Sequence, residues 1–254
     1  MFEDLKSVVE ATLDEVLPKE GERPAEFSEA MRYAVGSGGK RVRPMICLAS
    51  ALAVGGKAED ARYPAAAIEI LHNYTLVHDD LPAMDDDVER RGRPTVWKKF
   101  GEANAILVGD ALQALAYKVV AKAPRNVPEI VEALGEAGVG VVQGQVEDIA
   151  ATKDVDFIYT HKTADLFVAA AVMGGLAAGG GAEDIARLRA FALNLGLAFQ
   201  YEDDLLDGDS PYGRDKTEAL AKSTTDAAVS ALEGLPGDVS ALRTIASVLL
   251  GRSN

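Results

Sequence analysis

The sequence predicts an all-α protein, on three observations. Apolar residues return at helical spacing along nearly the whole chain, and the strict alternation typical of strands is almost absent. The segments are separated by short turn-forming stretches such as GSGGK, KAPRNVP and GLPGD. None of these stretches is long enough for an interdomain linker, and the composition does not shift. We therefore expect a single domain, residues 1–254, with a sizeable core.

Each predicted helix is a run of apolar residues at helical spacing, bounded by turn residues. The first run, MFEDLKSVVEATLDEVL, is an acidic amphipathic helix. Glycine-rich turns close the second and third helices, Pro82 ends the fourth, and KAPRNVP, AAGGGAED, DGDSPYG and GLPGD separate later ones. The predicted helices span residues 2–17, 25–36, 42–54, 61–80, 102–122, 127–150, 155–178, 183–206, 217–233 and 238–251.

The bulk composition excludes several classes of protein. A formal net charge of -14 and a pI near 4.7 argue against a nucleic-acid partner, which requires a basic surface. Cys47 is the only cysteine, so no internal disulfide is expected and a reducing compartment fits. The first helix lacks the basic start and apolar block of a signal peptide, and no uncharged apolar run approaches the ~18 residues of a membrane span. We therefore expect a cytoplasmic protein without integral membrane association.

Two of the predicted helices end in clusters of aspartates. YTLVHDDLPAMDD (74–86) and LAFQYEDDLLDGD (197–209) each carry an apolar helix into an acidic C-terminal end, where the helix dipole favours cations. A solvated acidic turn would explain one such cluster. Two matched clusters favour Mg²⁺, a hard cation that takes a few carboxylates and completes its shell with water and phosphate oxygens. Packed side by side, the two helices would direct their carboxylates across a shared cavity.

The spacing within each cluster is compatible with this interpretation. Asp203 and Asp207 are four residues apart, on one face of a helix. Asp79 and Asp85 are separated by about 240° on an ideal helical wheel. They converge only if the helix stops between them, and Pro82 supplies that break. The clusters lack the alternating ligands, central glycine and final glutamate of an EF-hand.

Basic residues accompany the acidic clusters. Arg90 and Arg91 follow the first cluster directly and resemble a phosphate fork, since guanidinium groups bind phosphate oxygens in bidentate fashion. A second basic group, Lys40, Arg41 and Arg43, follows a glycine-rich turn that does not match the P-loop pattern. Basic groups beside two magnesium clusters suggest two polyphosphate ligands, and nothing in the sequence resembles a nucleotide site.

These residues lie in blocks that resemble a known family, the trans-isoprenyl diphosphate synthases or polyprenyl synthetases. The blocks are GGKRVRP, EILHNYTLVHDDLPAMDDDVERRGRPT, GEANAILVGDAL, VVQGQVEDI, HKTADLFVAAAVMGG and LGLAFQYEDDLLD, in family order between residues 36 and 207. The four-residue spacer in DDLPAMD resembles that of bacterial farnesyl diphosphate synthases (geranyltranstransferases). The resemblance implies the isoprenoid synthase fold, a bundle of about ten or more helices around a deep central cavity. It also implies a homodimer with about three Mg²⁺ ions per active site.

The resemblance also implies roles for individual residues, in three groups. One group binds metal, one binds isopentenyl diphosphate, and one lies on the side of the allylic diphosphate. By resemblance the metal ligands are Asp79, Asp85 and Asp203, supported by Asp80, Asp86 and Asp207; the isopentenyl diphosphate residues are Lys40, Arg43, His72 and Arg91; the allylic residues are Arg90 and Lys222 together with the catalytic Lys162, Thr163 and Gln200.

The implied activity is short-chain prenyl transfer, in which isopentenyl diphosphate condenses with dimethylallyl or geranyl diphosphate. Metal ions and arginines stabilise the leaving diphosphate, a dry cavity protects the allylic cation, and the released pyrophosphate takes the proton. Tyr74, five residues before Asp79, resembles an aromatic floor that stops the product at fifteen carbons. Farnesyl diphosphate is therefore the expected product, with geranyl and geranylgeranyl diphosphate as alternatives.

The resemblance weakens in the C-terminal part. The family's Gly-Lys turn and Lys-x-Thr-Tyr-Pro segment are replaced by DGDSPYGRDKTEALAKSTT, and Trp97 stands where many members have histidine. This departure leaves open the alternative of a weakly active or regulatory subunit of a heteromeric synthase. A terpene cyclase on the same fold would require a degraded second aspartate motif and no isopentenyl diphosphate site. The sequence has neither feature.

Overall fold

A computed structural model describes residues 2–36, 38–150 and 153–250 of the protein. The described residues fold into an all-helical bundle with one short hairpin, which confirms the predicted fold class. In chain order the elements are α1 (Phe2–Val16), α2 (Ala25–Val35), α3 (Val42–Ala53), η1 (Ala58–Ala61), α4 (Arg62–Asp79), β1 (Glu89–Arg90), β2 (Arg93–Pro94), α5 (Val96–Phe100), α6 (Glu102–Val120), α7 (Val127–Asp148), α8 (Val155–Ile158), η2 (Tyr159–Ala164), α9 (Asp165–Ala177), α10 (Ala182–Asp207), α11 (Arg214–Ala231) and α12 (Ser240–Leu250).

The structure departs from the predicted helices in two places. The two-residue strands β1 and β2 and the five-residue helix α5 were not predicted, because they are too short to show a period. The segment predicted as one helix over 155–178 is divided into α8, the π-helical turn η2 and α9. The π-helical turn spans only six residues, too few for hydrophobic spacing to distinguish it from the α-helix that follows.

Helix α9 lies at the centre of the hydrophobic core. Almost all of its residues are buried, and it packs against α3, α4, α7 and α10. Its contact with α3 depends on Gly174, since a Cβ atom there would lie 2.0 Å from the carbonyl oxygen of Cys47. Although α9 is apolar on all sides, no helix in the described part of the chain is both long and apolar enough to cross a membrane.

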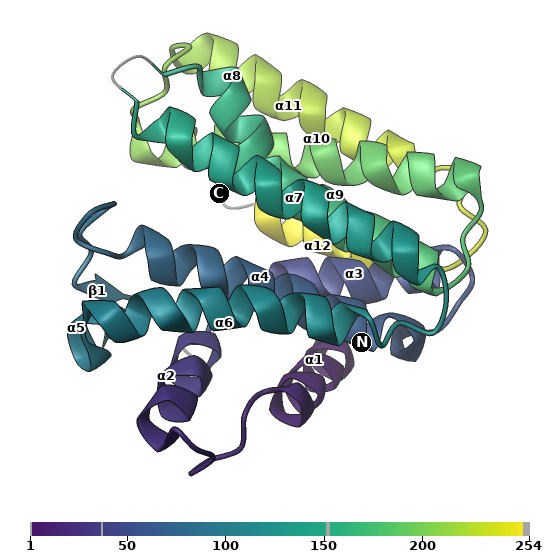
Figure 1. Ribbon diagram of the computed structural model, residues 1–254. Helices are drawn as coiled ribbons and strands as arrows, with labels where there is room; N and C mark the ends of the chain where they lie inside the picture. The colour runs from purple at the N-terminus through teal and green to yellow at the C-terminus, as the bar shows by residue number, and fades with distance from the viewer. Residues whose placement is uncertain (1, 37, 151–152, 251–254) are drawn as a thin grey trace.

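The arrangement of the helices brings the two acidic ends to the same end of the bundle. In Figure 1, α4 and α10 both run from right to left and end on the left side. The turn η2 lies at this end as well and contacts both α7 and α10. Helices α6 and α7 lie in front, facing the viewer, while α1 and α2 lie below the rest of the bundle.

Candidate active site

The first acidic cluster forms where α4 ends. The helix closes at Asp79, in agreement with the break predicted from Pro82, and the amide of Asp85 donates to the carbonyl oxygen of Asp79 at 2.9 Å. Burial raises the pKa of the Asp79 carboxyl to about 6; Lys162 acts against this rise and Asp85 adds to it. The two α4-side carboxylates proposed as metal ligands are therefore neighbours on one turn.

The two consecutive arginines of this region point to different partners. Arg90, on β1, donates to Asp80 at 2.7 Å and to Asp87 at 3.3 Å. Arg91 has a left-handed backbone (φ 55°), and its guanidinium donates to the carbonyl oxygen of Gly38 at 2.6 Å. The pair does not form the single phosphate fork that the sequence suggested, because one arginine binds the acidic cluster and the other reaches the glycine-rich loop.

The turn η2 places Lys162 and Thr163 against neighbouring helices. Lys162 Nζ donates to Asp148 Oδ2 on α7 at 2.5 Å, and Thr163 Oγ1 donates to Gln200 Oε1 on α10 at 2.9 Å. Gly144 allows this approach, because a Cβ atom there would lie 2.4 Å from the backbone nitrogen of Lys162. The structure thus places Thr163 in contact with Gln200, while the ammonium of Lys162, their proposed catalytic partner, is paired with α7.

The second acidic cluster continues along α10 from Gln200. Asp203 follows Gln200 by about one helical turn and Asp207 follows Asp203 by another, so the three residues share one side of the helix. Asp204 is buried and accepts a hydrogen bond from the hydroxyl of Tyr159 at 2.6 Å. That bond directs Asp204 toward Tyr159 of η2. Asp204 therefore has a structural partner, while its neighbour Asp203 is the residue proposed as a metal ligand.

The donor chemistry of the two acidic clusters suits Mg²⁺. Both clusters lie beside η2, since Lys162 acts electrostatically on Asp79 and Thr163 bonds Gln200, one turn before Asp203. Among the residues that the structure describes, no three His, Cys, Asp or Glu side chains converge on one point. Mg²⁺ is usually held by one or two carboxylates, with waters and substrate phosphates in its other positions. The aspartates named from the sequence are the residues that would hold it in this way.

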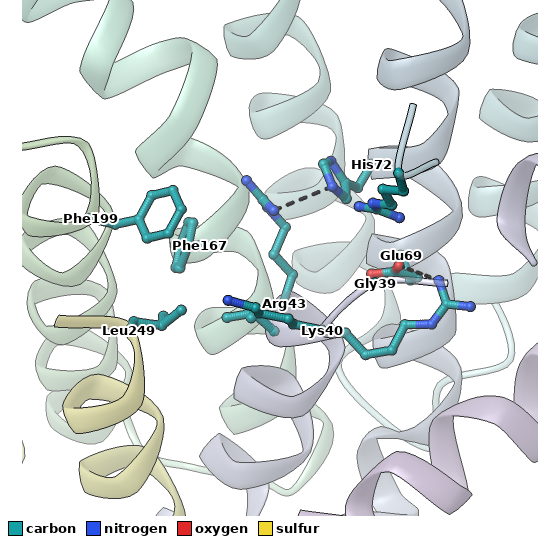
Figure 2. A pocket seen from close by; sticks show the side chains of 11 residues that line it. Gly39, Lys40, Arg43, Glu69, His72, Phe167, Phe199 and Leu249 are labelled. Atoms are coloured by element: carbon teal, nitrogen blue, oxygen red, sulfur yellow. Dashed lines mark hydrogen bonds and ion pairs between the residues drawn. The ribbon is translucent and has the colours of Figure 1, made fainter. Parts of the chain in front are cut away.

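A cavity of about 550 Å³ lies next to this region, between α3, α4, α9, α10 and α12. Figure 2 shows basic side chains on one side of the cavity and apolar side chains on the other, and the Arg43 guanidinium reaches across to within 4.8 Å of the centre of the Phe167 ring. The residues proposed to bind isopentenyl diphosphate all line it. The lining includes Lys40, Arg43, His72 and Arg91 on the basic side, and Phe167, Phe199 and Leu249 on the apolar side.

The electrostatics of this cavity favour an anionic ligand. Burial lowers the pKa of the Arg43 guanidinium to about 10, Glu69 acts against this change, and Arg91 adds to it. Arg43 Nη1 lies 3.4 Å from His72 Nε2. In the described structure Arg43 Nε and His72 Nδ1 are buried without a hydrogen-bond partner. Crowded cationic groups with unused polar atoms are stabilised when a phosphate group binds them.

Replacing His72 by glutamine is expected to reduce the loss of stability on acidification. In the folded protein the pKa of His72 lies well below 6.5, because burial disfavours the charged ring and Arg43 and Arg91 repel it. The unfolded chain therefore takes up a proton as the pH falls below about 6.5 and the folded chain does not, which costs up to ~1.4 kcal/mol per pH unit. Urea denaturation at about pH 7 and pH 5.5 measures this, and equal losses in wild type and variant would contradict it.

Lys222 lies apart from the cationic cavity. It is exposed in the middle of α11 and lines a separate hollow of about 480 Å³ between α10, α11 and the end of α12. The acidic side chains of Glu202, Glu218 and Asp226 share that hollow. The KST stretch (222–224), which resembles the family's Lys-x-Thr segment, is therefore in the middle of a continuous helix and does not open one. For Lys222 to bind substrate, α11 would have to move toward the cationic cavity, or the substrate would have to extend into this separate hollow.

Three residues of the site region were not singled out from the sequence. Glu69 is a buried carboxylate that lines the cationic cavity, and Asp148 binds Lys162. Gln145, on α7, is buried, and neither its amide nitrogen nor its oxygen has a hydrogen-bond partner among the described residues. Glu69 stands in the EILHNY block, and the other two in VVQGQVEDI. Their polarity on otherwise apolar helix faces was the available signal.

The fold and the cavity together define an all-helical protein with a cationic cavity of about 550 Å³ beside two acidic helix ends. Comparison with known proteins agrees, since residues 24–228 match polyprenyl synthetase, and the chain belongs to this family. It is 34% identical to a crystal structure of a FPP/GFPP synthase from Zymomonas mobilis, with a TM-score of 0.88, covering 98% of this chain and 100% of that one. The fold is therefore the isoprenoid synthase fold.

Two similar curated proteins are both named for the synthesis of geranylgeranyl diphosphate, also called geranylgeranyl pyrophosphate. The chain is 42% identical over 220 residues to the "Heterodimeric geranylgeranyl pyrophosphate synthase large subunit 1, chloroplastic" of Arabidopsis thaliana, covering 79% of this chain and 58% of that protein. It is 41% identical over 216 residues to the "Geranylgeranyl diphosphate synthase" of Cyanophora paradoxa, covering 80% of this chain and 71% of that protein. The chain thus spans little more than half the length of the first of these proteins.

Proposed function

We propose that this protein is a Mg²⁺-dependent short-chain trans-prenyltransferase that condenses isopentenyl diphosphate with an allylic diphosphate. The observation that carries the proposal is the cationic cavity with an apolar wall, placed beside two acidic helix ends that meet at η2. A diphosphate with a short isoprenoid chain fits such a site, because one end of the molecule is anionic and the other is apolar.

In this proposal the cavity binds isopentenyl diphosphate. Lys40, Arg43 and Arg91 hold its diphosphate. Phe167, which contacts the Arg43 guanidinium, and Phe199 supply the apolar lining beside them and exclude water around its alkene. The alkene therefore faces away from the basic wall, toward the region between the cavity and η2.

The allylic diphosphate lies between the two acidic clusters. Its bond from C1 to oxygen breaks, and the electron pair leaves with the diphosphate, whose charge Mg²⁺ neutralises when it is bound. Lys162 contacts a phosphate oxygen, while Thr163 Oγ1 and Gln200 Oε1 lie toward the cation. The alkene electrons of isopentenyl diphosphate form the new carbon–carbon bond, and the released pyrophosphate takes the proton that leaves.

We propose geranylgeranyl diphosphate as the product, since similar proteins at 41–42% identity are named as synthases of that compound. Farnesyl diphosphate, expected from the sequence, is the second candidate because of Tyr74. That side chain is buried (8% exposed) one turn before the end of α4, and its ring meets the ring of His78 edge-on at 5.2 Å. Incubation with isopentenyl and dimethylallyl diphosphates and Mg²⁺, followed by mass identification of the products, tests both. The absence of any prenyl product would overturn the proposed activity.

Replacing Tyr74 by alanine is expected to lengthen the product by at least one isoprene unit. Removing the ring opens space below the acidic end of α4, where a growing chain would extend. Tyr63→Ala is a matched control, because Tyr63 lies in the first turn of the same helix, far from Asp79. Its product should keep the wild-type length. An unchanged product in Tyr74→Ala would show that Tyr74 does not limit the chain.

We further propose that the protein forms a homodimer through α6 and α7. Large apolar side chains are exposed along one face of α7 and near the start of α6, which is unusual for a monomer surface. Both helices lie on the side that faces the viewer in Figure 1, and they contact each other. A relative named as a heterodimer subunit makes a different chain the alternative partner. The exposed apolar residues are Ile106 and Leu107 on α6, Val139, Val142 and Val146 on α7, and Ile149 directly after α7.

A further inference from the structure

Arg41 connects four helices at the edge of the cationic cavity. Its Nε donates to Glu10 Oε1 of α1 at 2.8 Å, its Nη1 to Glu69 Oε1 of α4 at 2.7 Å, and its Nη2 to the carbonyl oxygen of Val35, the last residue of α2, at 2.8 Å. Arg41 itself immediately precedes α3. Its side chain is only 3% exposed. The Arg41 guanidinium is thus engaged by protein groups at all three nitrogens, whereas Arg43 Nε has no hydrogen-bond partner among the described residues.

The backbone of Arg41 sets the direction of those neighbours. Its φ of 49° lies in the left-handed region, which is unfavourable for a residue with a side chain. Lys40 precedes this turn and Arg43 follows it by two residues, and both line the cavity. A relaxation of the turn would rotate both side chains relative to the cavity. The three hydrogen bonds of the Arg41 side chain hold the turn in place.

Among the partners of Arg41, Glu69 has an unexpected position. Its carboxylate is buried and lines a cavity suited to an anion, where its own charge opposes binding. Besides Arg41, Asn73 Nδ2 donates to Glu69 Oε1 at 3.2 Å and to its carbonyl oxygen at 2.8 Å. A carboxylate at this position is understandable if its function is to hold Arg41 rather than to contact the ligand. Figure 2 shows the ion pair at Glu69 beside the basic wall.

We propose that the Arg41–Glu69 ion pair is a positioning device, which fixes the turn before α3 so that Lys40 and Arg43 face the diphosphate. Arg41 and Glu69 act through these two residues and do not themselves bind the ligand. The inference rests on the proposed function for the identity of the ligand. Inorganic pyrophosphate serves as the probe, and its binding is measured without Mg²⁺ so that the acidic clusters contribute little.

The central experiment is the double variant Arg41→Met/Glu69→Met, titrated with pyrophosphate by calorimetry. Replacing both members of a buried ion pair by apolar residues of similar size is often neutral for stability, so this variant is expected to fold. We expect the dissociation constant for pyrophosphate to rise by about 10- to 100-fold, the cost of misplacing the ligand's contacts. If the pair acted only through its charges, the double variant would bind pyrophosphate about as tightly as wild type, because one cation and one anion are removed together.

Arg32→Met is the matched control. Arg32 also connects two helices, since it donates to the carbonyl oxygen of Pro18 at 2.8 Å and pairs with Asp14, but it does not line the cavity. Its pyrophosphate affinity should equal that of wild type even if its melting temperature falls. Arg41→Lys keeps the charge without the guanidinium fork and should bind with intermediate affinity.

Steady-state kinetics separate a positioning role from general damage. In Arg41→Lys the KM for isopentenyl diphosphate should rise by about tenfold, with the KM for the allylic diphosphate and kcat changed by less than about threefold. Equal pyrophosphate affinity in wild type and the folded double variant would overturn the inference while leaving the proposed function intact. A wild-type protein that binds pyrophosphate but makes no prenyl product would overturn the proposed function and leave this inference standing.

Discussion

Replacing Asp79 by alanine is expected to lower kcat by about a thousandfold, or ~4 kcal/mol in the barrier, because Asp79 is proposed to hold the ion that stabilises the leaving diphosphate. Asp203→Ala should have a similar effect, since Asp203 lies on the other acidic cluster beside η2. Neither loss should be recovered by saturating substrate, because the missing interaction acts on the leaving group in the transition state. Release of pyrophosphate in the presence of Mg²⁺ and both substrates measures the rate.

Stability and metal dependence provide the controls for this prediction. Asp79→Ala should fold at least as stably as wild type, because burial and the nearby Asp85 disfavour the Asp79 carboxylate in the folded protein. Asp215→Ala removes an exposed aspartate from the first turn of α11 and should keep the wild-type rate. An unaltered rate in either Asp79→Ala or Asp203→Ala would contradict the metal-ligand proposal.

The double variant Val139→Glu/Val146→Glu is expected to convert the proposed dimer entirely into monomer. Both valines are 61% exposed on the α7 surface and lie seven residues apart on one helix face. In a symmetric interface each substitution is present in both subunits, so the dimer would bury four unpaired carboxylates. Burying an unpaired charge costs several kcal/mol. Light scattering coupled to size-exclusion chromatography should report the 26.8 kDa mass of one chain in place of twice that mass.

Val248→Glu is the matched control for the dimer prediction. Val248 is 59% exposed on α12, away from the α6–α7 surface, so its substitution introduces the same charge at similar exposure. We expect this variant to remain dimeric. A wild-type chain that is itself monomeric would overturn the homodimer proposal and favour the alternative of a different partner chain.

Hydrophobic spacing was sufficient to predict the long helices, because burial of one face imposes a regular pattern on the sequence. Helix α7 begins at Val127 as predicted and ends at Asp148, two residues before the predicted end. The end of α4 at Asp79 was also predictable, since Pro82 forbids continuation of the helix. The short elements between α4 and α6 were not, because two to five residues carry no period.

Within the site, the sequence predicted the types of groups but not their partners. Arg41 and Arg43 stand two residues apart in the same basic motif, yet the first is bound by Glu69 and the second lines the cavity. Arg90 and Arg91 likewise separate, one to Asp80 and one to the glycine-rich loop. Left-handed residues at the turns direct neighbouring side chains to opposite sides, and no pattern of residue types reveals such a turn.

By itself the sequence determined an all-helical bundle, two acidic helix ends and the basic residues that accompany them, because helical periodicity and charge are local properties of the chain. The tertiary structure alone decided which charges neutralise one another and which line a cavity. That division depends on contacts between helices far apart in sequence, such as the meeting of η2 with α10 through Thr163 and Gln200. Only the packed bundle fixes those distances, and electrostatic interactions depend on them directly.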